Sequence, residues 1–160
     1  MLNINGVQLK CSRNMSAFLD VLAYAEGTKG RGNHDGYNKL VNPAGYFNDY
    51  SRHPNQRVQV NAKLVSTAAG RYQFLSRHWQ HYKTQLKLAD FGPESQDRWA
   101  IQLIRERGAI DDVEAGRVVA AIAKCSNIWA SLPGANYPGQ PMRKLAELQA
   151  KFVEYGGVPA

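Results

Sequence analysis

Residues 19–28, LDVLAYAEGT, predict the last turns of an amphipathic helix. Leu19 and Leu22 precede Glu26 by seven and four residues, so the three side chains share one face of that helix. Gly27 follows directly, and glycine is the residue that most often ends helices. We therefore expect Glu26 at the end of a core-facing helix, where an apolar stripe meets a loop.

The expected surroundings of Glu26 favour a protonated carboxyl group. Apolar neighbours hydrate a carboxylate poorly, and this raises its pKa. The partial negative charge at the C-terminal end of a helix acts in the same direction. A carboxylic acid that keeps its proton near neutral pH is suited to general acid catalysis. A solvated glutamate without a chemical role is the more common occupant of such a position, so both interpretations stay open at this point.

Length and composition predict one globular domain over residues 1–160, with residues 1–14 as a lead-in segment. Hydrophobic residues make up 44% of the chain, which excludes a wholly disordered protein. The net charge of +7 is uneven. Residues 1–89 carry twelve Lys and Arg against four carboxylates, whereas residues 90–160 carry eight against nine. The first half therefore predicts a basic surface and an anionic partner, which could be nucleic acid, anionic lipid or an acidic cell-wall polymer.

The cysteines and the N-terminal segment bear on where the protein is made. Cys11 and Cys125 could form a disulfide, but Cys125 lies in an apolar helical pattern and is better explained as a buried thiol. Residues 23–25, AYA, imitate a signal-peptide cleavage site, yet Asp20 interrupts the apolar segment before it. No apolar run approaches the length of a transmembrane helix. The sequence thus predicts synthesis in the cytoplasm without a signal peptide.

The rest of the chain predicts helices with one small β element, and therefore a mainly helical α+β domain. Asn14 or Ser16 can cap the first helix, residues 28–56 are rich in loop-forming residues, and residues 57–61 alternate like a short strand. The further helical patterns are the stripe Tyr72, Leu75, Trp79, Tyr82 and Leu86, the segment from Pro93 to Gly108, the segment from Val118 to Cys125, a helix that begins or extends at Ile128 and Trp129, and a last stripe of Met142, Leu145, Leu148 and Phe152.

Most familiar chemical motifs are missing from the sequence. His78 and His81 lie three residues apart, but zinc needs three or four converging ligands, so no metal site is expected. The chain has no nucleotide-binding glycine loop and no GxSxG motif, and Cys125 has no identifiable activating base. Among the four carboxylates before residue 90, Glu26 is the single glutamate, and Asp49 is the only reasonable second acid. A structural role in a turn explains Asp49 equally well.

Five segments carry a family resemblance: residues 25–28 (AEGT), 34–37 (HDGY), 47–54 (FNDYSRHP), 70–73 (GRYQ) and 126–135 (SNIWASLPGA). Together they resemble the bacteriophage lambda endolysin family of lytic transglycosylases, in the same order and over almost the whole chain. The resemblance implies a lysozyme-like domain with a substrate cleft. Two mobile loops, or lips, would cover that cleft and match roughly Gln56–Val65 and Pro133–Ala146.

The resemblance also implies a reaction and a set of site residues. Family members cut the bond between N-acetylmuramic acid and N-acetylglucosamine in peptidoglycan and leave a 1,6-anhydro ring, and their catalytic glutamate matches Glu26. Ala25 replaces a serine of the best-known member, which puts one supporting hydrogen bond at Glu26 in doubt. Arg57 and Lys63, on the first lip, would attract carboxylates of the wall. The substrate-binding candidates are Tyr37, Asp49, Tyr50, Arg57, Gln73, Asn127 and Tyr137, and no cofactor or metal is expected.

These inferences define the expected partners and the alternatives. We expect a monomer that binds peptidoglycan glycan strands, without nucleic acid and without stable membrane association. It would be made in the host cytoplasm and would act in the periplasm after a holin has permeabilised the membrane. One alternative is a hydrolytic muramidase that uses Glu26 with Asp49. A basic nucleic-acid-binding protein and a non-catalytic wall-binding module are two others, and neither explains the placement of Glu26.

Overall fold

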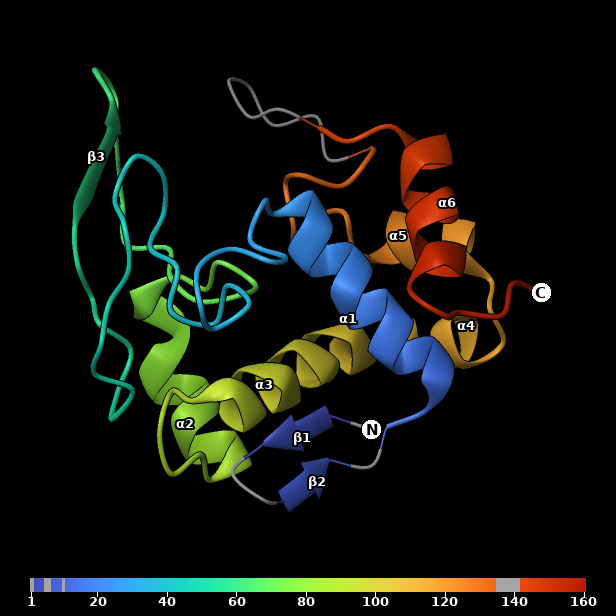
Figure 1. Cartoon of the computed structure of the whole chain (residues 1–160), viewed down its shortest axis with the longest axis horizontal. Coiled ribbons are helices and arrows are strands. Elements are labelled where there is room, and N and C mark those ends of the chain that lie inside the picture. Colours follow the sequence, from blue (N-terminus) through green and yellow to red (C-terminus); the bar gives the residue numbers. More distant parts are fainter. Residues whose placement is uncertain (1, 5–6, 10, 135–141) are drawn as a thin grey trace. The chain divides into compact units, whose positions relative to one another are not determined.

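The structure, a computed structural model, describes residues 2–4, 7–9, 11–134 and 142–160 and is mainly helical (Figure 1). β1 and β2 form an antiparallel hairpin where the sequence predicted only a lead-in segment. The elements in chain order are β1 (Leu2–Ile4), β2 (Val7–Leu9), α1 (Arg13–Ala25), β3 (Val58–Asn61), β4 (Leu64–Ser66), the 3-10 helix η1 (Ser76–His78), α2 (Trp79–Leu86), α3 (Pro93–Glu106), α4 (Ile110–Glu114), α5 (Val118–Cys125) and α6 (Leu145–Glu154).

Helix α1 begins directly after Ser12, whose hydroxyl oxygen accepts a hydrogen bond from the backbone N–H of Met15 at 2.9 Å. This bond satisfies one of the N–H groups that the first turn of a helix leaves without a partner. The predicted caps Asn14 and Ser16 are wrong, because both residues lie inside the helix. The sequence has three residues able to cap a helix within five positions, and the structure uses the first of them.

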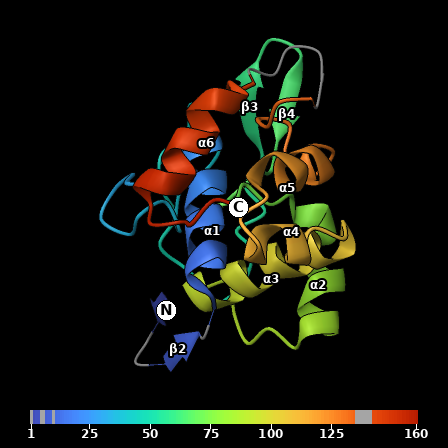
Figure 2. The same ribbon diagram turned by 90° about the vertical axis from the view of Figure 1, so that its right-hand side faces the viewer.

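The buried face of α1 agrees with the predicted apolar stripe. Leu19 and Leu22 are fully buried, and the helix packs against α4 and α6 (Figure 2). The last helical residue is Ala25, and Gly27 has a φ of +76°, a conformation that residues with a Cβ rarely adopt. The predicted end of the helix is confirmed, and Glu26 is its C-cap residue.

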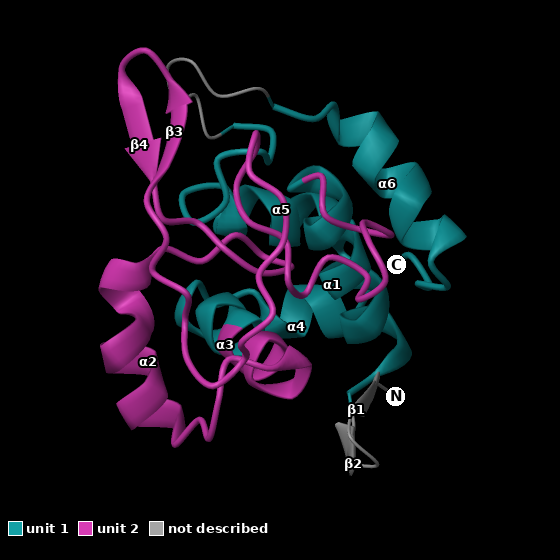
Figure 3. Ribbon diagram, turned by 60° about the vertical axis from the view of Figure 1, so that its left-hand side comes forward, with its two compact units in different colours: residues 1–26, 100–160 teal, residues 27–99 magenta. Residues whose placement is uncertain are grey.

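The chain forms two compact units (Figure 3). Unit 1 contains residues 1–26 and 100–160, and unit 2 contains residues 27–99. One boundary directly follows Glu26, and the other lies inside α3. The glutamate that the sequence singled out is therefore the last residue of unit 1 before the chain enters unit 2.

Helix α5 completes the helical packing of unit 1, with contacts to α4 and α6. It spans the predicted residues and places Cys125 fully in the interior. The Cys125 thiol is free, and burial raises its pKa to about 12. The prediction of a buried thiol in place of a disulfide is confirmed.

Two helical predictions in unit 1 are wrong. No helix begins at Ile128 and Trp129. Their backbone N–H groups instead bind the carbonyl oxygen of Cys125, at 3.0 and 3.2 Å, and close a turn at the end of α5. Met142 is exposed and lies before α6, which begins at Leu145. In both cases apolar residues lie next to a helix without being part of it.

Unit 2 contains the predicted β element and few other regular elements. β3 and β4 form an antiparallel hairpin with Val58 opposite Ser66, as the alternation of residues 57–61 indicated. The hairpin leaves Leu64 and Val65 exposed at 40% and 41%. It corresponds to the first of the two expected lips.

The predicted stripe from Tyr72 to Leu86 is only partly helical. Ala69 and Phe74 exchange backbone hydrogen bonds of 3.0 and 2.9 Å, which turns the chain at Tyr72. The α-helix begins later, at Trp79, and Tyr82 is its buried residue. The spacing of the aromatic residues therefore reflects a common aromatic core, because the Phe74 ring stacks on Trp99 with centroids 4.0 Å apart.

Helix α3 begins at Pro93, with Glu94 in its first turn and Arg105 in its last turn, as predicted. These charges are favourable at the two ends of the helix dipole. In the part of the chain that the structure describes, no helix is long and apolar enough to span a bilayer.

Candidate active site

Glu26 lies half-buried at the end of α1, with its carboxyl group desolvated by the surrounding protein. The hydroxyl of Ser131 donates a hydrogen bond to Glu26 Oε1 at 2.9 Å. Burial raises the pKa of Glu26 to about 7, whereas the Ser131 hydrogen bond and the charge of Arg143 act in the opposite direction. Desolvation is the dominant effect, as expected for a carboxyl group on the apolar face of a helix.

A pKa near 7 gives Glu26 two chemical capacities. A substantial fraction of the molecules holds the proton at neutral pH, so the group can act as a general acid. Once ionised, the same carboxylate is basic enough to take a proton back. One residue can therefore serve both halves of a proton-transfer cycle.

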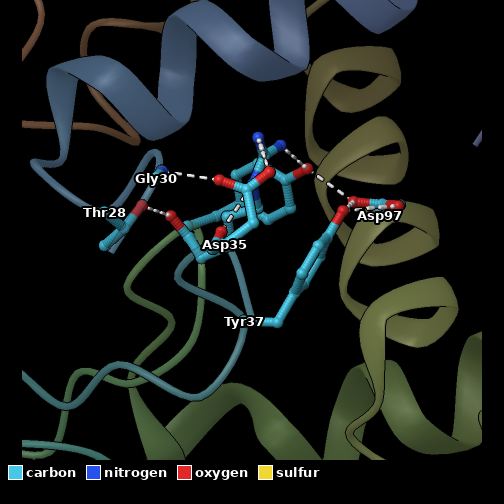
Figure 4. Close-up of polar contacts among 7 residues, drawn as sticks. Thr28, Gly30, Asp35, Tyr37 and Asp97 are labelled. Atoms are coloured by element: carbon cyan, nitrogen blue, oxygen red, sulfur yellow. Dashed lines mark hydrogen bonds and ion pairs between the residues drawn. The ribbon is translucent and has the colours of Figure 1, made fainter. Parts of the chain in front are cut away.

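Backbone and side-chain hydrogen bonds hold the loop that follows Glu26 (Figure 4). The hydroxyl of the buried Thr28 donates to the carbonyl oxygen of Arg71 at 2.5 Å. The backbone N–H of Gly30 donates to Asp35 Oδ1, also at 2.5 Å, and the buried Arg71 guanidinium pairs with Asp35 Oδ2 at 3.2 Å. These bonds hold the loop after Glu26 against Arg71, a buried arginine that belongs to unit 2, as the loop does.

Asp97 is the centre of a buried hydrogen-bond network in unit 2. Its carboxylate accepts hydrogen bonds from the hydroxyl of Tyr37 at 2.9 and 3.0 Å (Figure 4), and from the hydroxyl of Tyr72 at 2.5 Å. Asp97 and Tyr72 are fully buried, so the carboxylate depends on these donors. Burial, followed by the negative charge of Asp97, raises the pKa of both tyrosines and keeps them protonated.

Tyr50 lies beside His34, with its hydroxyl 2.8 Å from His34 Nδ1 and the two rings stacked at 5.9 Å. Burial raises the pKa of Tyr50 to about 12. The role of Tyr50 in substrate binding stays a prediction.

Asp49 is exposed, and its Oδ1 accepts a hydrogen bond from the backbone N–H of Ser51 at 2.8 Å. Hydrogen bonds from Ser51 lower the pKa of Asp49 and favour its ionised form. This is the geometry of an aspartate that stabilises a turn, as the structural interpretation of the sequence suggested.

The other substrate-binding candidates differ in their surroundings. Gln73 has a φ of +53°, and its amide donates to the carbonyl oxygens of Gly70 at 2.9 Å and Lys39 at 3.2 Å, so it stabilises a turn. Arg57 and Asn127 are exposed. Tyr137 lies outside the described residues, as does half of the second expected lip.

Two residues at Glu26 escaped the sequence analysis. Ser131 lies within the segment 126–135 that carried the resemblance, and Arg143 lies at the end of the second expected lip, but neither was assigned a role. Ala25 has no hydroxyl that could donate a hydrogen bond to Glu26. Ser131 supplies such a hydroxyl from a remote part of the chain. Within residues 11–134 and 142–160, no three His, Cys, Asp or Glu side chains gather as a possible metal site.

Comparisons with known proteins identify the family of the chain. A protein-family model described as Endolysin matches residues 16–159. The endolysin of Escherichia phage lambda is 49% identical over 152 residues, which cover 93% of this chain and 95% of the phage protein. The chain belongs to the endolysin family. The endolysin of Escherichia phage P2 is 50% identical over 162 residues, covering 92% of this chain and 96% of that protein.

The fold of this endolysin matches that of bacteriophage lambda lysozyme. A structure of lambda lysozyme complexed with a chitohexasaccharide gives a TM-score of 0.91, with 48% identity over 96% of this chain and 100% of the other. A second structure of lambda lysozyme gives a TM-score of 0.86 with the same identity and coverage. The predicted lysozyme-like α+β fold and the family are confirmed. The chain is a lysozyme-like glycosidase of the phage endolysin type, a class of enzyme that degrades peptidoglycan.

Proposed function

We propose that this endolysin cleaves the bond between N-acetylmuramic acid and N-acetylglucosamine in peptidoglycan and leaves 1,6-anhydro-N-acetylmuramic ends. The observation that carries the proposal is the Glu26 carboxyl group, with a pKa of about 7 and one hydroxyl donor. The solved complex of lambda lysozyme with a chitohexasaccharide supports a glycan as the substrate here.

In the proposed reaction, protonated Glu26 donates its proton to the glycosidic oxygen. The bond from that oxygen to C1 of the muramic ring breaks, and the N-acetylglucosamine side leaves with a hydroxyl group. The C6 hydroxyl of the muramic ring then attacks the oxocarbenium-like C1. Its proton passes to the Glu26 carboxylate, which restores the starting acid. Because the attack is intramolecular, positioning of the ring replaces a bound water.

A hydrolytic muramidase would require a second carboxylate, as nucleophile or as base for water. Asp49 is the candidate, but its carboxylate already accepts the Ser51 backbone N–H in a turn. We therefore expect Asp49→Asn to retain most of the lytic activity, because an asparagine side chain can accept the same hydrogen bond. A loss of activity comparable to that of Glu26→Gln, in a folded protein, would favour the hydrolytic mechanism.

The proposed substrate contacts come from several segments of the chain. Tyr37, Tyr50 and Asn127 would bind acetamido groups or stack on sugars, together with Gln73 and Tyr137. The Tyr37 hydroxyl donates to Asp97, its backbone N–H donates to the His34 carbonyl oxygen, and its own carbonyl oxygen accepts from the Gln96 amide, so the ring is the part of Tyr37 proposed to contact substrate. Arg57 and Lys63 would attract the lactyl and peptide carboxylates of the wall.

The charge of unit 2 supports an anionic polymer as the partner. Residues 27–99 contain eleven Lys and Arg and five Asp and Glu, a balance of +6. We propose that this charge draws the enzyme to peptidoglycan, with no role for nucleic acid and no stable membrane association. The proposed setting is synthesis in the host cytoplasm, action as a monomer in the periplasm, and release that depends on a holin.

Mass spectrometry of muropeptides released from purified sacculi tests the reaction. We expect products one water lighter than hydrolysed muropeptides, without a reducible muramic end. Fully hydrated, reducible products would overturn the transglycosylase mechanism and support the muramidase. Glu26→Gln should lower the rate by at least about 100-fold while the protein stays folded, since general acid catalysis contributes about 10²–10⁴-fold. Substantial activity in that variant would remove Glu26 from the mechanism.

A further inference from the structure

Two segments of unit 1 that are remote in sequence meet beside the end of α1. The Ser131 hydroxyl donates to Glu26 Oε1 at 2.9 Å. The carbonyl oxygen of Ser131 in turn accepts a hydrogen bond from the backbone N–H of Arg143 at 2.8 Å. Ser131 is therefore held between the candidate acid on one side and the backbone of Arg143 on the other.

The Arg143 side chain continues the contact with α1. Its guanidinium lies over the Tyr24 ring, 5.0 Å from the centroid, and its Nε lies 3.4 Å from the carbonyl oxygen of Ala25. Tyr24 and Ala25 are the two residues that directly precede Glu26. Arg143 thus contacts the last turn of α1 with its side chain and Ser131 with its backbone.

We propose that Arg143 is a positioning residue, which holds the Ser131 hydroxyl against Glu26 and places a positive charge next to the acid. This inference rests on the proposed role of Glu26 as the single acid and base. A loose Ser131 would leave the Glu26 carboxylate without a side-chain hydrogen-bond donor among the residues that the structure describes. The arginine fork is suited to this role, because one planar group can stack on a ring and donate to an oxygen at the same time.

The remaining charged groups around Arg143 act on the tyrosine rather than on Glu26. Glu147 of α6 accepts a hydrogen bond from the Tyr24 hydroxyl, and this bond is the main cause of its lowered pKa. Lys151 of α6 lies over the same Tyr24 ring at 4.9 Å and pairs with Glu154. Of the two cations on this ring, Arg143 is the one whose charge lowers the pKa of Glu26. Lys151 therefore offers a matched control.

The experiment is a direct titration of the Glu26 carboxyl group by NMR in protein labelled with carboxyl-¹³C glutamate. The Glu26 signal is assigned by its loss in Glu26→Gln. In Arg143→Met we expect the pKa of Glu26 to rise by about half a unit or more, because a cation and a well-placed donor are lost together. In Lys151→Met we expect a change of less than about 0.2 units, since this partly exposed cation pairs elsewhere.

A double-mutant comparison tests the positioning itself. If Arg143 holds Ser131 in place, Ser131→Ala raises the pKa of Glu26 less in the Arg143→Met protein than in the parent protein. Full additivity, or an unchanged Glu26 pKa in folded Arg143→Met, would overturn the proposal. If Arg143→Met does not fold, Arg143→Gln provides the same titration with a polar side chain of similar length.

The titration is independent of the reaction chemistry. It needs no substrate, so hydrated products from sacculi would contradict the proposed transglycosylase reaction and leave the Arg143 result intact. Conversely, anhydro products together with an unchanged Glu26 pKa in Arg143→Met would uphold the reaction and reject the positioning role.

Discussion

The hydroxyl of Ser131 lies 2.9 Å from Glu26 Oε1, although the two residues are 105 positions apart in the chain. This bond stabilises the ionised carboxyl group, whereas burial stabilises the protonated one. The two effects together leave the pKa of Glu26 at about 7. The acidity of the candidate acid is therefore set jointly by α1 and by the loop that follows α5.

Ser131→Ala should move the pH dependence of lysis. Loss of the hydrogen bond raises the pKa of Glu26, so the proton is retained to higher pH and the alkaline limb of kcat moves upward. A hydrogen bond to a charged group is worth about 1.5–3 kcal/mol, which corresponds to a shift of about one unit or more. Clearing of sacculi between about pH 5 and pH 9 measures the limb. Ser126→Ala is the control, because the Ser126 hydroxyl binds the Ala123 carbonyl. An identical limb in both variants would contradict the prediction.

Glu26→Gln should stabilise the folded protein in a pH-dependent way. The folded pKa of about 7 lies above the ordinary value of 4.5, so the folded state holds the proton more tightly than the unfolded state. The contribution of protonated Glu26 is fully present below pH 4.5 and is lost as the pH rises through 7. Above that pH the ionised group costs about 3 kcal/mol.

Urea unfolding at a series of pH values measures this difference. We expect the stability gap between Glu26→Gln and the parent protein to grow between pH 4.5 and about pH 7 and then to stay constant. Asp20→Asn is a suitable control, because Asp20 lies on the same helix. A gap that does not change with pH would show that the carboxyl group of Glu26 is not desolvated.

Tyr72→Phe should destabilise the protein through the buried Asp97. The substitution keeps the aromatic packing but removes a hydroxyl that donates to a fully buried carboxylate. We expect a loss of about 1.5–3 kcal/mol in the free energy of unfolding. Tyr46→Phe serves as the control, since Tyr46 is 45% exposed and surface changes stay within about 0.5 kcal/mol. Equal stability of the two variants would mean that Asp97 finds another donor.

Gly70→Ala should be strongly destabilising. Gly70 has a φ of +83°, and a Cβ at this position would lie 2.4 Å from Gln96 Oε1. That oxygen cannot move away easily, because it accepts the backbone N–H of Arg71 while the Gln96 amide donates to two carbonyl oxygens. We expect a loss of at least about 2 kcal/mol.

Gly45→Ala is the matched substitution for Gly70→Ala. A Cβ at Gly45 would meet no atom within 4 Å, and its φ is not positive. We therefore expect a change in the free energy of unfolding within about 1 kcal/mol, because alanine restricts the unfolded chain and meets no clash at this position. Thermal unfolding of the two variants measures the difference, and comparable melting temperatures would contradict the packing argument at Gly70.

The sequence was sufficient to place Glu26, because the evidence for it is local. The spacing of Leu19 and Leu22 fixes the buried face of α1, and Gly27 fixes its end. The same local evidence located α3, α5 and the strand of the β3–β4 hairpin. Where a segment has one periodic apolar face and one clear stop, few alternatives remain.

Features that depend on contacts between remote segments could not be found this way. Ser131 and Arg143 reach Glu26 across more than a hundred residues, and no spacing rule connects them. Tyr72 follows the helical spacing of Tyr82, yet it lies in a turn, where its buried hydroxyl donates to Asp97. The sequence likewise offers both Ser12 and Ser16 near the start of α1, and the structure shows Ser12 as the cap.

The reactivity of the buried Cys125 thiol can report how often unit 1 opens. With a pKa of about 12, its thiol is ionised in only about one molecule in 10⁵ at pH 7, and it has no exposed surface. Alkylating reagents attack thiolates, so they reach this sulfur only in molecules whose α5 has separated from its neighbours. Once Cys11 is replaced by serine, the labelling rate of Cys125 counts these openings in the active enzyme, without any denaturant.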